Sequence, residues 1–142
     1  MLEDIETNKH EWKIFEFSKL GESCFSKEFS VGDYKWKIRI YPNGVCCQRD
    51  QSISIYLTSV DAEGFGCRKR VKAKVTLSVK DQISGEHHKK VFSNWFSAVD
   101  DSLGLHAFMP LHEFKDPKRG FLVKDCCIVE ADVSLSLVLS MA

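Results

Sequence analysis

Cysteine and histidine are the residues of this sequence best suited to chemistry, because a thiolate beside a histidine base forms a nucleophile and both side chains bind zinc. The sequence has six cysteines and five histidines. Cys46-Cys47 and Cys126-Cys127 are adjacent pairs, and neighbouring residues on a strand point to opposite faces. Neither pair has the C-x-x-C spacing of redox or zinc sites, so we expect free thiols that pack as small apolar side chains.

The remaining patterns also argue against catalysis. His87-His88 has no second pair of ligands at zinc-finger spacing, so we interpret it as a polar hairpin tip. Asp100-Asp101 is interpreted as a capping element of a loop. The sequence has no calcium loop, phosphate-binding loop or dinucleotide-binding turn. Most of the histidines fall in expected loops, and no cysteine stands at a helix start. We therefore predict no enzymatic activity, no catalytic residue, no metal site and no cofactor.

The charge balance favours a protein ligand over a nucleic acid. The chain has 20 basic and 20 acidic residues, whereas nucleic-acid binders usually carry a basic excess. The cluster Cys67-Arg68-Lys69-Arg70 is interpreted as a solvated strand face with its preceding loop; a phosphate-binding patch is the alternative. The first residues are acidic and polar, unlike a signal peptide, and no apolar stretch reaches the length of a membrane helix. We expect a cytoplasmic or nuclear protein that does not enter membranes, although a piece of a longer chain would look the same.

The elements that must position any site are β-strands, because apolar and polar residues alternate over several segments. From Val71 to Val79 every odd position is apolar, and the even positions are Lys, Thr or Ser. The same alternation covers residues 34–40, 52–58 and 127–139, and shorter candidates are 11–17, 25–29, 91–96 and 120–123. One solvated face per strand is typical of antiparallel sheets. The pattern predicts an all-β, eight-stranded antiparallel β-sandwich, with one helical turn at 110–114.

Several phrases of the sequence, in consistent order, resemble a known family. His10–Leu20 is similar to W-x-I-x-x-F-S-x-L, and Phe25–Ile38 is similar to S-x-x-F-x-x-G-G-x-x-W-x-I, with Asp33 in place of the second glycine. Ile40–Gly44 resembles Y-P-x-G, and Ser52–Leu57 resembles L-S-L-Y-L. Segments 108–111, 120–125 and 128–133 complete the likeness to plant MATH (meprin and TRAF homology) domains, a TRAF-like family. We assign residues 1–9 to an N-terminal tail and 10–140 to a MATH domain.

The resemblance implies a module that binds short extended peptides or partner surfaces along a sheet face or edge. In the family's ubiquitin-ligase adaptors a W-G-F segment contributes to the groove; this chain has Leu103-Gly104-Leu105 instead. We expect an exposed apolar patch at the two leucines. The residues that the resemblance assigns to a peptide- or partner-binding groove are Ser52, Val75, Trp95, Leu103, Gly104 and Leu105.

The predicted function is adaptor or substrate recognition in ubiquitin-related or signalling pathways. Three alternatives remain open at this stage. The chain could be the substrate-targeting domain of a larger ubiquitin-specific protease, or a self-associating scaffold whose apolar patch meets its own copy. A redox sensor would require a reactive thiol of low pKa.

Overall fold

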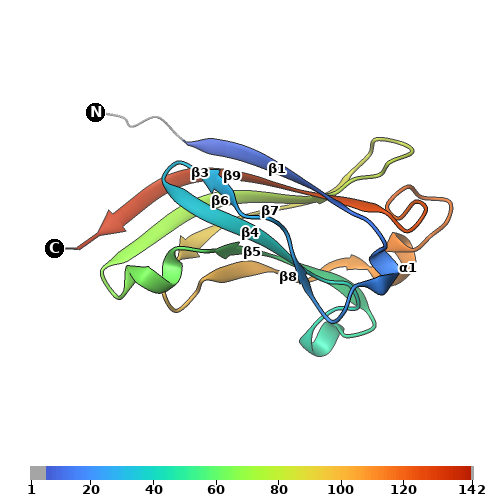
Figure 1. The fold of residues 1–142 in the computed structure, drawn as a ribbon, viewed down its shortest axis with the longest axis horizontal. Helices are drawn as coiled ribbons and strands as arrows, with labels where there is room; N and C mark the ends of the chain where they lie inside the picture. Colours follow the sequence, from blue (N-terminus) through green and yellow to red (C-terminus); the bar gives the residue numbers. More distant parts are fainter. Residues whose placement is uncertain (1–5, 142) are drawn as a thin grey trace.

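The alternating segments form the two sheets of an antiparallel β-sandwich in the computed structural model, which describes residues 6–141 (Figure 1). One sheet, sheet A, has the order β1-β9-β6-β7. The other, sheet B, has the order β2-β4-β5-β8, and β3 also pairs with β4. The strands of sheet A are β1 (Thr7–Ile14), β9 (Cys127–Ser140), β6 (Lys69–Val79) and β7 (His88–Phe96). Those of sheet B are β2 (Cys24–Phe25), β3 (Phe29–Val31), β4 (Tyr34–Tyr41), β5 (Ser52–Ser59) and β8 (Ser102–Pro110).

The core lies between the sheets, where each strand contributes its apolar parity. The odd positions of β6 from Val71 to Val79 are all completely buried, as the alternation predicts. Trp36 of β4 and Phe96 of β7 meet edge to face across the interior, with ring centroids 4.8 Å apart. Both sheets therefore bury one face against the other, and the predicted antiparallel sandwich is confirmed, with nine strands in the described residues where the sequence predicts eight.

Short helices and turns close the ends of the sandwich. They are η1 (Phe17–Lys19), η2 (Cys46–Gln48), η3 (Ala62–Phe65) and α1 (Leu111–Phe114). The helix α1 corresponds to the helical turn predicted at 110–114. β1 begins and β9 ends at one end of the sandwich, and α1 lies at the opposite end (Figure 1). Among residues 6–141, no helix combines the length and the apolar character that crossing a membrane requires.

Three strand predictions differ from the structure. The predicted strand 25–29 is divided into β2 and β3, because residues 26–28 lie opposite two residues of β4 and form a bulge. Residues 120–123 are not a strand; Val123 pairs with Cys126 across a tight turn in which Lys124 and Asp125 have positive φ. β8 is missing from the predicted strands, because Gly104 and the leucines around it read as a loop entering a strand.

The domain boundary also differs at the N-terminus. β1 begins at Thr7, so Thr7, Asn8 and Lys9 pair with β9 instead of belonging to the predicted tail. The predicted tail residues 1–5 lie outside the described residues.

The end of β9 departs from the predicted alternation. Leu135, Leu137 and Leu139 share one parity in the sequence, which predicts that all three face the core. The register shifts where Lys72 pairs with Leu137 and Ala73 pairs with Leu135, leaving Ser136 as an extra residue of β9. Because a one-residue slip reverses the faces of a strand, the side chains beyond the bulge turn outward. Leu137 and Leu139 are consequently 53% and 41% exposed.

Candidate functional site

β8 forms one edge of sheet B, and β7 forms one edge of sheet A. In residues 6–141, β8 pairs with β5 alone and β7 pairs with β6 alone. The two edges are joined by a short loop, and the His88 ring nitrogen Nε2 lies 2.8 Å from the Phe108 carbonyl oxygen. One side of the sandwich thus presents two adjacent sheet edges with unpaired backbone groups, the feature to which an extended peptide can add as a further strand.

Leu103 and Leu105 lie on the inward parity of β8. They pair with Leu57 and Ile55, which are fully buried, and their side chains are half-buried against the core. The sequence predicts an exposed patch at these leucines, but the structure places them at the margin of the core. The reason is that β8 is a strand of the sheet, so its leucines follow the strand's alternation.

The other predicted groove residues are distributed over both sheets. Val75 is completely buried in β6, so its side chain belongs to the core and not to a surface. Ser52 is 5% exposed at the start of β5, where its hydroxyl donates a hydrogen bond to Gln48 Oε1 at 3.0 Å. Trp95 is half-buried on the outer face of sheet A, opposite Lys72. The structure therefore brings together Leu103, Gly104 and Leu105, and it separates Ser52, Val75 and Trp95 from them.

Gly104 is required by the packing of β5 against β8. It lies opposite Tyr56, and a Cβ atom added at this position would lie closer to the Ile55 carbonyl oxygen and the Tyr56 Cα than van der Waals contact allows. A bulge follows, since residues 106–108 lie opposite Ser54. The Ser54 hydroxyl donates to the His106 carbonyl oxygen at 2.5 Å, which fixes this bulge in β8. Bulges at sheet edges commonly re-aim side chains next to binding sites.

The outer face of sheet B carries an aromatic row that the sequence analysis did not select. Tyr41 of β4 and Tyr56 of β5 meet edge to face, with ring centroids 5.8 Å apart, and the Tyr56 centroid lies 5.6 Å from that of the His106 ring of β8. The Tyr56 hydroxyl and His106 Nδ1 are hydrogen-bonded. The Arg39 guanidinium lies 4.8 Å from the Tyr41 ring centroid and 4.7 Å from that of Phe25. Part of the signal is in the sequence, because Arg39 and Tyr56 occupy the outward parity of the predicted strands 34–40 and 52–58, and Tyr41 directly follows the first of them.

Burial tunes the electrostatics of this aromatic row. Partial burial, followed by the neighbouring Cys46, Tyr41 and Cys47, raises the pKa of Tyr56 to about 12. The phenol is therefore uncharged at neutral pH and can act as a hydrogen-bond donor or acceptor. Together with the Arg39 guanidinium, it gives the face beside the β8 edge stacking surfaces, one fixed positive charge and directional polar groups.

The thiols and histidines occupy mainly structural positions. Cys46, Cys47 and Cys67 are exposed and Cys127 is buried, so the prediction that the cysteines pack as small apolar residues holds for Cys127 and is wrong for the exposed three.

Three histidines belong to strands and not to the predicted loops: His10 to β1, His88 to β7 and His106 to β8. His87 Nδ1 accepts a hydrogen bond from the Asp81 backbone N–H at 3.0 Å. In the part of the chain that the structure describes, no three His, Cys, Asp or Glu side chains gather in a way that could hold a metal ion.

Comparison with known proteins identifies the domain type. The family model described as "MATH domain" matches residues 9–133. The chain is 37% identical over 139 residues to Ubiquitin C-terminal hydrolase 12 of Arabidopsis thaliana, covering 96% of this chain and 12% of that protein. It is 35% identical over 130 residues to a MATH domain and coiled-coil domain-containing protein of the same plant, covering 89% of this chain and 40% of that protein.

A solved structure has the same fold. TRAF5 of Notothenia coriiceps superimposes with a TM-score of 0.73 at 22% sequence identity, covering 94% of this chain and 76% of that chain. The present chain spans about an eighth of the hydrolase (12%), so the likeness concerns one domain of that protein.

Proposed function

Since this chain belongs to the MATH domain family, a family of protein-interaction modules, we propose that it binds an extended peptide segment of a partner protein along the free edge of β8. The observation that carries the proposal is the edge itself. β8 has unpaired backbone groups on one side, half-buried Leu103 and Leu105 facing inward, and the Tyr56–His106 pair facing outward. Backbone pairing supplies affinity in this mode of binding, and alternate side-chain pockets supply sequence selectivity.

The two faces of β8 would read alternate residues of the bound strand. Peptide side chains directed inward meet Leu103 and Leu105, which offer apolar contact. Those directed outward meet His106 and the Tyr56 ring beside it, which offer stacking and hydrogen bonding. The preferred peptide under this proposal therefore alternates an apolar residue with an aromatic or polar one.

The biological setting that we propose is recognition of substrates or adaptors in a ubiquitin-related pathway, in the cytoplasm or the nucleus. The support is the similarity over 96% of this chain to a plant protein named as a ubiquitin C-terminal hydrolase. A targeting domain within a larger protease and a stand-alone adaptor both fit this setting. The open reading frame of the full-length transcript separates the two.

The test begins with selection of peptides from a random library on the purified domain. Amide chemical-shift mapping of a selected peptide is expected to give its largest changes along β8 and at Tyr56. Replacing Leu103 and Leu105 together by alanine is expected to weaken binding by at least about tenfold, or ~1.4 kcal/mol. His106→Ala, at an exposed position, provides a second variant that keeps the core intact.

The matched control is Trp12→Ala on β1, the opposite edge of sheet A. Trp12 is also a half-buried apolar residue packed against the core, so its loss should lower stability without changing peptide affinity. Shift changes centred on β1, or unchanged affinity in both β8 variants, would refute the proposed site. Dimerisation in light scattering that is abolished by the β8 variants would instead favour the self-associating scaffold.

A further inference from the structure

A second surface with the properties of a binding site lies on sheet A, at the end of the sandwich where β6 begins. Arg70, Lys72 and Lys74 occupy the outward parity of β6, and Arg68 precedes the strand. Trp95 of β7 lies opposite Lys72. The Arg70 guanidinium stands 4.6 Å from the Trp95 ring centroid, and the Lys72 ammonium stands 5.9 Å from it. The indole thus holds two cations at the surface, a geometry that is favourable for cation–π attraction.

The bulge in β9 adds apolar side chains to this surface. Because the register shifts at Ser136, Leu137 and Leu139 lie opposite Lys72 and Arg70 on the outer face. The Ser136 hydroxyl donates to the Lys72 carbonyl oxygen at 3.1 Å, which stabilises the shifted register. Without the bulge, these leucines would have the parity of the core residues. The fold therefore places apolar groups next to cations by a specific backbone feature.

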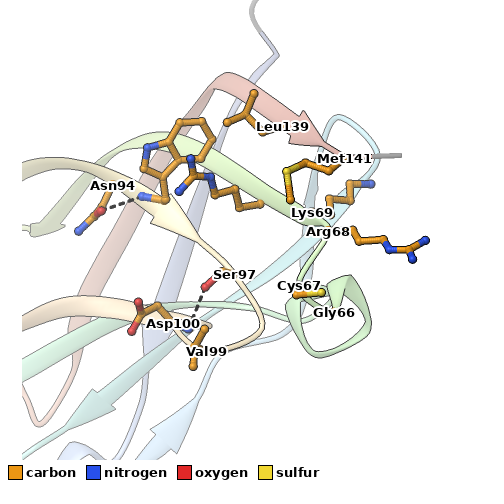
Figure 2. A pocket seen from close by; sticks show the side chains of 12 residues that line it. Gly66, Cys67, Arg68, Lys69, Asn94, Ser97, Val99, Asp100, Leu139 and Met141 are labelled. Carbon is orange, nitrogen blue, oxygen red and sulfur yellow. Dashed lines mark hydrogen bonds between the residues drawn. The ribbon is translucent and has the colours of Figure 1, made fainter.

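Arg68, Arg70, Trp95 and Leu139 line a pocket of about 560 Å³, which we call the cationic pocket; Lys72 lies beside it, over the Trp95 ring. Figure 2 shows Leu139 and Met141 on one side and Ser97, Val99 and Asp100 on the other, with Arg68 extending outward at the rim. Met141 and Val99 are 66% and 91% exposed.

The charge of the cationic pocket is not balanced by ion pairs among the described residues. Within residues 6–141, the salt bridges involve Lys19, Arg49 and Lys80 as the cations, and none involves Arg68, Arg70 or Lys72. One carboxylate, that of Asp100, lines the pocket beside three basic residues. The Lys69 ammonium is directed to the Tyr34 and Phe65 rings at 4.8 and 5.4 Å. The surface is therefore complementary to a ligand with several negative charges and at least one apolar group.

We propose that the cationic pocket binds an acidic peptide segment of a partner protein. Carboxylates of the segment pair with Arg70, Lys72 and Arg68, and an apolar side chain of the segment packs on Trp95 and Leu139. The guanidinium forks suit carboxylates because they donate two parallel hydrogen bonds. A concave site with an apolar wall favours a peptide over a flat anionic membrane. No residue of β8 lines the pocket, so we expect the domain to hold a segment at each site.

The test is fluorescence anisotropy of a labelled peptide rich in Asp and Glu with one leucine, titrated with the full chain. Its counterpart with Asn and Gln in place of the acids is the ligand control. Arg70→Glu combined with Lys72→Glu is expected to weaken binding of the acidic peptide at least about tenfold. Lys89→Glu combined with Lys90→Glu is the matched protein control, since both residues are exposed on the same sheet and the net charge changes equally. This control is expected to stay within about twofold of the unmodified protein, because distant surface charges are screened.

Trp95→Ala keeps the charge and removes the stacking surface, so its expected effect is a loss of affinity that persists at high salt. Melting temperatures of all variants establish that they are folded. Three outcomes would each overturn the proposal. The two charge-reversal variants could bind the acidic peptide equally, or the unmodified protein could bind the neutral peptide as well as the acidic one. The third is binding to phosphatidylserine vesicles or DNA without binding to the acidic peptide. The Leu103/Leu105 alanine variant should bind the acidic peptide normally, so failure of the β8 proposal is distinguishable from failure of this one.

Discussion

Basic residues stand at both ends of β6, but they have carboxylate partners at one end and apolar neighbours at the other. At the C-terminal end, Lys80 lies with its ammonium 2.9 Å from Glu11 Oε2 and 3.1 Å from Glu130 Oε2. Asp81 follows it, 4% exposed, and one of its carboxylate oxygens accepts the backbone N–H groups of Ile83 and Ser84, each at 3.0 Å. Lys80 and Asp81 thus both have partners within the domain.

At the N-terminal end, Arg70 and Lys72 face Leu139, Leu137 and Trp95, and no carboxylate of the described residues pairs with them. The difference arises from the neighbours that the register of β9 supplies: Glu130 beside Ser78 at one end, and Leu137 beside Lys72 at the other. The cross-strand partners of a basic residue therefore determine its role: beside a carboxylate it stabilises the fold, and beside apolar residues it stays available for a ligand.

The largest contrast between the two ends should appear in thiol reactivity. Cys67 is exposed at the cationic end, whereas Cys127 is buried beside the partnered end. Burial, and to a smaller extent Cys126, raises the pKa of the Cys127 thiol to about 12, so it stays protonated at neutral pH. Timed N-ethylmaleimide labelling followed by peptide mass spectrometry is expected to show Cys127 reacting at least about a thousandfold more slowly, because reaction requires opening of the core. In denaturant the two rates should converge; similar rates in the folded protein would contradict the burial of Cys127.

Asp81→Ala is expected to lower the free energy of unfolding by about 2 kcal/mol, since the backbone N–H groups of Ile83 and Ser84 lose a charged acceptor. Those hydrogen bonds hold the pKa of Asp81 below its ordinary value of 3.8. Its stabilising contribution is therefore present above pH 3.8 and is lost as the pH falls through the folded-state pKa. Urea unfolding at several pH values should show the difference between the two proteins shrinking in acid. A difference that is constant with pH would show that the carboxylate charge is not the stabilising feature.

The smallest expected effect is that of removing single cations from the two ends. Lys80→Met leaves Glu11 and Glu130 directly opposite each other across β1 and β9, and it should cost about 0.5–1 kcal/mol. Lys72→Met breaks no ion pair and should change stability by less than about 0.3 kcal/mol, or increase it slightly. Thermal unfolding at low and high salt measures both effects, and the cost of Lys80→Met should fall with salt. Equal costs for the two substitutions would erase the distinction between the ends.

The alternation of apolar and polar residues was sufficient to predict the sandwich and most of its strands. Val71–Val79 is predicted as a half-buried strand, and all its odd residues are buried. β8 was not predicted, because Gly104 interrupts a short run of two leucines and a glycine is usually a loop signal. The glycine at position 104 is explained by tertiary packing, because the backbone of β5 leaves no room for a Cβ atom there. The divided β2–β3 segment and the turn at Lys124 and Asp125 likewise depend on what lies opposite them.

The predicted groove residues lie in different parts of the fold. The resemblance selects Leu103–Leu105, which the structure places on the edge strand β8. It also selects Val75, although the alternation of residues 71–79 puts Val75 on the apolar face, and the structure buries it completely. Trp95 lies on the neighbouring strand β7 of the same sheet, on the outer face. The aromatic row of Tyr41, Tyr56 and His106 became visible only when three strands distant in sequence were placed side by side.

By itself the sequence determined the fold class and the family, because alternating side-chain chemistry and ordered motifs are properties of the chain. The tertiary structure decided which charges are paired, which strand edges are free and which leucines of β9 turn outward. The physical reason is that strand register and bulges are set by contacts between residues far apart in the sequence, and a shift of one residue exchanges the two faces of a strand.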